Sequence, residues 1–161
     1  MAADYFLKLD PKVEGESTDS KHKGEIELES WSFGLSNASS MLQGGGGGSG
    51  KATPSDFSAT KKLDKSTPRL SQAVAMGDHF KSAIITLRKA GGTQQEYLTI
   101  TLSDVFISSY QAGGSNGGGL PMETFSLNYS KIVQEYKEQK ADGSLGGAVK
   151  LGYDFAKQVK V

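Results

Sequence analysis

The chain has 161 residues, 18 lysines and arginines, 18 aspartates and glutamates, and no cysteine. This length suits one domain with its own core, so we expect a single domain over 1–161. The neutral charge balance argues against nucleic acid as a partner. The lack of cysteine excludes disulfides, thiolate metal sites and a cysteine nucleophile.

The N-terminal segment MAADYFLKLDPK has neither the basic region nor the apolar stretch of a secretory signal peptide. Since no window has the apolar length of a membrane helix, we expect no membrane insertion and a cytoplasmic location before any export. Within the same segment, Tyr5, Leu7 and Leu9 alternate with other residues, which predicts a half-buried β-strand.

The segment 25–35 changes its hydrophobic phase part-way along. The apolar residues fall on even positions at Ile26 and Leu28, and then on odd positions at Trp31 and Phe33. A parity switch within an unbroken β pattern predicts a bulge or a sharp bend, where the strand passes from one sheet to another. We expect Trp31 to be an aromatic anchor of the core.

The other side chains of this segment are polar. With Trp31 turned inward, Ser30 and Ser32 are expected on the opposite, hydrated face. Glu25, Glu27 and Glu29 share one parity, which more often indicates a solvated face or a partner surface than acid–base catalysis.

A glycine run, MLQGGGGGSGKATP, occupies residues 41–54. From Gly45 it fits a phosphate-binding loop up to Gly50 and Lys51, but Ala52 stands where that motif needs a magnesium-binding Ser or Thr. Pro54 and an alternating, strand-like sequence follow instead of a helix. We therefore predict an extended glycine-rich loop over about 38–53, in preference to a nucleotide site.

One short α-helix is expected over about 66–77. Ser66 or Thr67 provides the N-cap, Pro68 lies in the first turn and Gly77 provides the C-cap. Its small apolar face consists of Leu70, Ala73 and Val74, and it is expected to cover one end of a barrel.

The second half of the sequence predicts two hairpins and a bent strand. The turns are expected near Gly91–Gly92 and at Asp142–Gly143. In 96–110 the apolar parity switches between Leu102 and Val105, so this long strand is expected to bend. Residues 149–161 alternate as a half-buried strand does. Together these patterns predict an all-β-dominated fold: a bent two-sheet antiparallel β-barrel with one short α-helix.

Catalysis and metal binding have no support in the residue pattern. His22 and His79 are the only histidines, and each is predicted to be a solvated surface residue without a second ligand. There is no GxSxG element. We therefore predict no catalytic residues, no metal and no cofactor, and hence no enzyme.

The sequence resembles the haemolysin-coregulated protein (Hcp) family, which forms the tube of bacterial type VI secretion. The matching stretches extend over nearly the whole chain in the same order: DYFLKLD, VEGESTDSKHKGEIELESWSFGLSN, GSGK, KKLDKSTPRL, AIITLRKAGG, EYLTITLSDVFISSY, QKADG and VKLGYDF. The resemblance implies a subunit of homohexameric rings that stack into a secreted tube. It also implies small effectors carried in the lumen, and a spike protein and a contractile sheath as partners.

The resemblance also suggests two sites. Ser32, with Ser30 second, is expected on the lumen wall. The ring-stacking loop is expected to consist of Gly44, Gly45, Gly46, Gly47, Gly48, Ser49, Gly50 and Lys51. Two alternatives stay open at this point: a monomeric β-sandwich binding module, and a nucleotide-dependent enzyme that uses Lys51.

Overall fold

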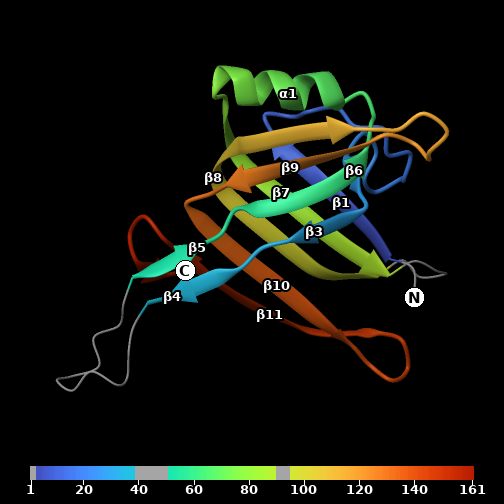
Figure 1. Ribbon diagram of the computed structural model, residues 1–161. Helices are drawn as coiled ribbons and strands as arrows, with labels where there is room; N and C mark the ends of the chain where they lie inside the picture. The colour runs from blue at the N-terminus through green and yellow to red at the C-terminus, as the bar shows by residue number, and fades with distance from the viewer. Residues whose placement is uncertain (1–2, 39–50, 90–94) are drawn as a thin grey trace.

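The computed structural model describes residues 3–38, 51–89 and 95–161. Twelve strands and one helix account for most of this part of the chain (Figure 1). The elements are β1 (Ala3–Asp10), β2 (Ile26–Leu28), β3 (Ser30–Ser32), β4 (Leu35–Asn37), β5 (Ala52–Pro54), β6 (Phe57–Lys62), α1 (Thr67–Met76), β7 (His79–Lys89), β8 (Glu96–Gly113), β9 (Met122–Asn128), β10 (Lys131–Gln139), β11 (Leu145–Asp154) and β12 (Val159–Lys160).

A ten-stranded antiparallel sheet makes up the body, and strand β8 belongs to both of its halves. The first half of β8 pairs with β7 and β10, and its second half pairs with β9. Between the halves lies Asp104, with a left-handed φ of 53°. This position falls between Leu102 and Val105, so the bend predicted from the parity switch is confirmed.

The predicted switch in 25–35 is confirmed in the same way. Strand β2 pairs with β1, whereas β3, which begins two residues later, pairs with β6. The chain therefore crosses from one half of the sheet to the other at Glu29. Among the described residues no ladder joins β2 to β3, so the sheet folds back on itself without closing into a hydrogen-bonded barrel. In that respect the prediction of a barrel needs correction.

The core lies between the two halves of the folded sheet. Large side chains without exposure fill it, among them Leu7, Ile85, Leu102 and Phe125. Trp31 packs against this core but is only half-buried, so the prediction of a core anchor is met in part.

Helix α1 lies across one end of the strands and packs against β8 (Figure 1). It begins and ends within one residue of the predicted 66–77. Leu70 and Ala73 are buried, and Gly77 ends the helix in the left-handed conformation, with its N–H donating to the carbonyl of Val74 at 3.2 Å. No helix among the described residues has the length and apolarity to cross a membrane.

The C-terminal strands differ from expectation. Alternation over 149–161 predicts a half-buried strand, yet Val149, Leu151, Val159 and Val161 are all exposed. Val149 and Leu151 lie beside rungs at which β10 pairs with β8, but among the described residues little covers their side chains.

Strands β4 and β5 form a separate two-stranded ribbon (Figure 1). Asn37 pairs with Ala52, so Ala52 and Thr53 at the end of the predicted 38–53 loop belong to strand β5, and residues 39–50 of that loop lie outside the described residues. Residues 90–94, which contain the predicted turn at Gly91–Gly92, lie outside the described residues. The other predicted turn is confirmed by Gly143, whose φ is 87°.

Candidate functional site

Polar side chains, most of them small, line the outward face of β3, β6, β9 and the second half of β8. Ser30 and Ser32 on β3 are both exposed, as predicted, while Trp31 between them points inward. The strands pair in register, so directly paired residues point to the same side of the sheet.

Two rows of neutral polar residues follow from this register. One row runs through Ser32, Ser58, Ser126 and Ser109, and the other through Ser30, Thr60, Thr124 and Gln111. None of the eight is charged or apolar. Neighbouring strands lie about 4.8 Å apart, so the rows form a continuous hydroxyl-lined face across four strands.

Hydrogen bonds within the face join hydroxyls across strands. The Ser109 and Ser126 hydroxyl oxygens lie 2.5 Å apart, and those of Thr60 and Thr124 lie 3.5 Å apart. Lys62 on the rim contacts Glu29 at 3.5 Å, so opposite charges balance each other there. The face can therefore offer many weak, neutral hydrogen bonds but has no strong local charge.

Aromatic rings lie directly behind the hydroxyl-lined face. Trp31 stacks on Phe33 and on Phe57, with ring centroids 6.1 and 6.0 Å apart, and Tyr5 meets the edge of Trp31. Such pairs contribute stability beyond their buried area. The strands that carry the small outward side chains are therefore packed on their inner side against stacked aromatic rings.

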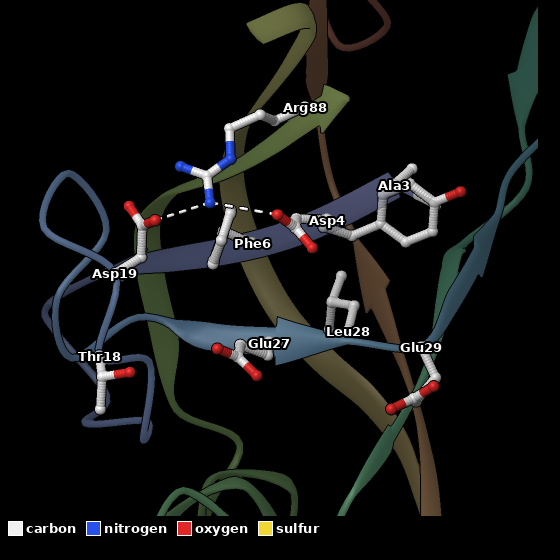
Figure 2. Close-up of a pocket in the computed structure, with 10 residues that line it drawn as sticks. Ala3, Asp4, Phe6, Thr18, Asp19, Glu27, Leu28, Glu29 and Arg88 are labelled. Atoms are coloured by element: carbon white, nitrogen blue, oxygen red, sulfur yellow. Dashed lines mark hydrogen bonds and ion pairs between the residues drawn. The ribbon is translucent and has the colours of Figure 1, made fainter. Parts of the chain in front are cut away.

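A polar hollow lies at the free edge of the sheet beside β2 (Figure 2). At its wall the Arg88 Nη2 donates to Asp4 at 3.2 Å and to Asp19 at 2.6 Å. The hydrogen bond from Arg88 lowers the pKa of Asp19 to about 2. Glu27 and Glu29 complete an acidic rim and are exposed, as predicted for a solvated face or a partner surface.

His22 is buried, which contradicts the prediction of a solvated surface residue. Its Nδ1 lies 2.9 Å from the Glu25 carboxylate, its Nε2 lies 2.6 Å from Glu96, and its ring stacks on Phe6 at 4.4 Å. The reason is that the 11–25 loop folds over the outer face of β1. The polar neighbours of His22 in the sequence do not indicate this contact. The other histidine, His79, is exposed as predicted.

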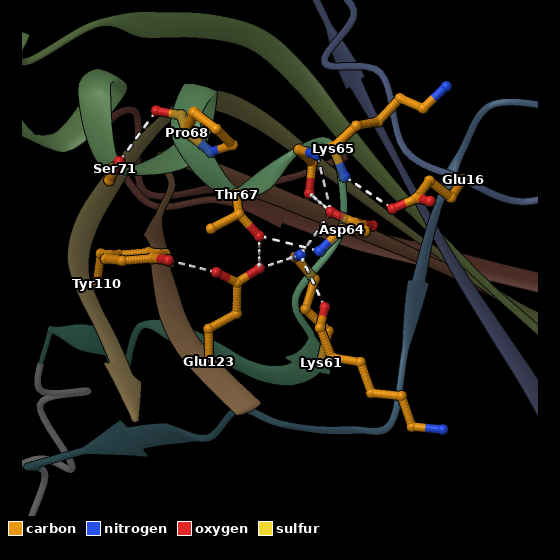
Figure 3. Close-up of polar contacts among 11 residues, drawn as sticks. Glu16, Lys61, Asp64, Lys65, Thr67, Pro68, Ser71, Tyr110 and Glu123 are labelled. Atoms are coloured by element: carbon orange, nitrogen blue, oxygen red, sulfur yellow. Dashed lines mark hydrogen bonds and ion pairs between the residues drawn. The ribbon is translucent and has the colours of Figure 1, made fainter. Parts of the chain in front are cut away.

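A buried ion pair joins β6 to β9 beneath the hydroxyl-lined face (Figure 3). Lys61 and Glu123 are both fully buried and contact each other, and Lys61 also bonds to Asp64 at 2.8 Å. Glu123 accepts hydrogen bonds from Thr67, at 3.0 Å, and from Tyr110. Burial and the bond to Glu123 raise the pKa of Tyr110 to about 12.

Sequence reasoning missed this ion pair, although the pattern carried a signal. Lys61 shares the inward parity of Phe57 and Ala59, and Glu123 shares that of Phe125. A charge at an apolar position on each of two strands indicates a buried pair, because an unpaired buried charge is too costly.

The alternative of a nucleotide site at Lys51 gains no support. Gly44 to Gly50 lie outside the described residues, and Lys51 is exposed and leads directly into strand β5. The helix N-terminus that would bind a phosphate is therefore missing after Lys51. Across 3–38, 51–89 and 95–161 no group of three or more acidic or histidine side chains is arranged to hold a metal ion.

Comparison with known proteins supplies the family. Residues 6–136 match the family model described as "Type VI secretion system effector, Hcp". The chain belongs to the Hcp family. It is 46% identical over 162 residues to Protein hcp1 of Pseudomonas aeruginosa, with 99% of each chain covered.

Solved Hcp structures share its fold. A structure described as a type six secretion system protein superposes with a TM-score of 0.94, at 33% identity and with 99% of this chain and 100% of the other covered. Hcp1 from Salmonella typhimurium gives a TM-score of 0.81 at 34% identity, with both chains fully covered. The predicted resemblance to the Hcp family is confirmed.

Proposed function

We propose that this Hcp-family chain is the ring subunit of the inner tube of type VI secretion. Six copies form a ring, the rings stack into a tube, and the tube carries small effectors in its lumen before it is secreted. The observation that supports this role is the hydroxyl-lined face, whose two rows are uncharged and backed by stacked aromatic rings.

The chemistry of this face suits a channel wall. Cargo must be held and then released, so a wall with a large apolar patch or a strong charge of one sign would retain it. The two rows offer hydroxyl and amide groups only. Ser32 and Ser30 are the proposed lumen residues, and their row partners Ser58 and Thr60 extend the same wall.

Ring formation needs two different faces on each subunit, one of which meets the other on the next copy. The folded sheet leaves β2 and β12 as free edges on opposite ends of its longest path. Such edges present unpaired backbone groups that readily join another chain. A homohexamer uses both edges, whereas a monomeric binding module leaves both exposed.

Stacking is assigned to the segment Gly44–Lys51. It lies in the sequence between strands β4 and β5, and fixing its six glycines costs roughly 1–2 kcal/mol of backbone entropy each. We therefore expect it to be ordered only where the next ring holds it. Removing Gly44–Gly48 should leave the single ring intact and weaken tube formation, measured by electron microscopy. We expect no detectable ATP binding by the parent chain or by Lys51→Ala. If the parent chain bound ATP measurably and Lys51→Ala did not, the proposal would be contradicted.

The remaining partners follow from this role. The tube carries a spike protein at its tip and lies within a contractile sheath, and the subunit is cytoplasmic until the tube is assembled and secreted. The role requires no catalysis, cofactor or nucleic acid.

The test compares ring formation with cargo retention. Ser32→Arg places a bulky cation on the wall in every subunit, yet exposed substitutions usually change stability by less than about 0.5 kcal/mol. We expect native mass spectrometry to show hexamers as for the parent chain, and co-purification of small effectors to fall. Ser115→Arg, at an exposed position in the loop after β8, serves as the matched control.

Two outcomes would overturn parts of this proposal. A clean monomer of the parent chain at micromolar concentration and physiological salt refutes the tube role and favours the monomeric β-sandwich module. If Ser32→Arg rings retain effectors unchanged, the lumen wall lies on another face.

A further inference from the structure

The two free edges of the long sheet carry opposite charge. The strand order runs from β12 at one edge to β2 at the other. Residues 3–29 at the β2 edge contain eight carboxylates and four lysines, whereas residues 131–160 at the β12 edge contain six lysines and four carboxylates. Although the whole chain is neutral, residues 3–29 therefore carry a net negative charge and residues 131–160 a net positive charge.

The β12 edge also bears an apolar face that the described part of the chain leaves exposed. We call strands β10, β11 and β12, residues 131–160, the C-terminal wing. On one face Ile132 pairs with Tyr153, and Ile132 is buried in the core. Further out on the same face, Tyr136 pairs with Val149, and these side chains are 49% and 61% exposed.

The apolar face continues over Leu151 and ends in a lysine. Leu151 is 71% exposed and lies between Val149 and Tyr153 on the same side of β11. Lys160 pairs directly with Tyr153, so its side chain belongs to this face as well. The wing therefore presents an apolar strip with a cation at the sheet edge.

The opposite edge provides a recess of matching charge. Beside β2 the structure has a hollow of about 380 Å³, lined by Asp4, Glu27 and Glu29 among others (Figure 2). The guanidinium of Arg88 fixes Asp4 in place through Nη2. Glu27 and Glu29 are exposed, and Glu27 forms no salt bridge among the described residues, so it is available to a cation from outside.

We propose that the C-terminal wing docks on the β2 edge of the next copy, with Lys160 against the Glu27–Glu29 rim. This assignment rests on the proposed ring and names the two surfaces that build it. The apolar strip then covers the neighbour's sheet edge, and the apolar side chains of residues 149–153 become buried, as their alternation in the sequence predicts.

A second copy of this chain is the occupant that the charges favour. Every copy offers both halves of the contact, and opposite charges steer the two different faces together while like faces repel. A contact between two different faces closes into a ring or grows into a filament, whereas a two-fold contact would bring like charges together.

The test is a charge exchange followed by native mass spectrometry. Glu27→Lys and Lys160→Glu should each raise the concentration for half-assembly by about tenfold or more, since like charges then face each other. The chain with both changes should assemble near the parent concentration. In a 1:1 mixture of the two single variants every contact between unlike variants pairs opposite charges, so the mixture should recover assembly, in rings that contain equal numbers of the two variants.

Two further variants separate this contact from folding and from the ring itself. Leu151→Asp should prevent rings while the far-ultraviolet circular dichroism stays that of the parent. Lys81→Glu, exposed on β7 away from both edges, should assemble as the parent does. If the parent forms rings and the edge variants form them equally well, the docking is wrong and the proposed function stands. If the parent is a monomer, the proposed function fails, and this contact fails with it.

Discussion

Removing Glu123 should destabilise the fold more than most single substitutions, because it leaves a buried cation without its partner. Lys61 has no exposure and depends on Glu123 and Asp64 for its charge balance. Breaking a buried ion pair by deleting one partner costs about 3–5 kcal/mol. Total stabilities are about 5–15 kcal/mol, so Glu123→Ala removes a large part of the folding free energy.

The size of this loss can be measured by thermal unfolding. A change of 1 kcal/mol shifts the midpoint by about 2–4 °C in a domain of this size, so we expect Glu123→Ala to unfold roughly 6–20 °C below the parent. Parent and variant are compared at one protein concentration, since assembly makes the midpoint depend on concentration.

A double variant provides the control. Lys61→Met combined with Glu123→Leu removes both charges and fills a similar volume, and such replacements are often neutral or stabilising by about 1–4 kcal/mol. We expect it to unfold near the parent temperature. If Glu123→Ala loses less than about 1 kcal/mol, or if the double variant is as unstable as the single one, the reasoning about the buried charge is refuted.

Three further outcomes test the loop, the helix end and a buried phenol. Asp19→Asn should reduce the loss of stability between pH 3.8 and about 2. The lowered pKa of Asp19 stabilises the folded chain above pH 3.8, and this contribution disappears as the pH falls to about 2. Acid unfolding followed by circular dichroism measures the difference. Gly77→Ala should lower the free energy of unfolding by about 1–2 kcal/mol, because Gly77 has a left-handed φ of 65°. Gly15→Ala should lower it more, since the added Cβ would lie 2.3 Å from the Glu25 carbonyl oxygen. Urea denaturation compares the two variants. Burial raises the pKa of Tyr129 to about 12 from 10.0, so stability should fall from pH 10 upward, and Tyr129→Phe should reduce that fall in alkaline unfolding.

Features that depend on neighbouring residues were predictable from the sequence. The helix between Ser66 and Gly77 follows from Pro68 in its first turn and from Gly77, which ends it in the left-handed conformation, although Ser66 makes no side-chain cap hydrogen bond. The parity switch before Val105 predicts the bend at Asp104, because side chains must change sides when a strand passes between sheets. The exposure of Ser32 follows from the inward turn of Trp31.

Features that depend on distant strands were not predictable in the same way. Ser30 and Ser32 indicate a hydrated strand, but only the register of β6, β9 and β8 shows that hydroxyls continue across four strands. The burial of His22 depends on a contact with Glu96, which is 74 positions away. Alternation in 149–153 predicts burial, yet Val149 and Leu151 are exposed, since a sequence pattern does not specify which surface would cover them.

The buried ion pair and the hydroxyl-lined face are two consequences of one strand register. Lys61 is the direct partner of Glu123, and the adjacent Thr60 and Thr124 are partners on the opposite side of the sheet. A slip of β6 by one residue would turn the lysine outward and a threonine into the core, and would separate the hydroxyl rows. The charged pair therefore adds a penalty against misregister that apolar residues of similar size do not supply. We expect the Lys61→Met, Glu123→Leu double variant to keep its stability but to show weaker or doubled nuclear Overhauser contacts between Thr60 and Thr124. A single, unchanged set of these contacts would mean that the apolar residues Phe57, Ala59 and Phe125 fix the register alone.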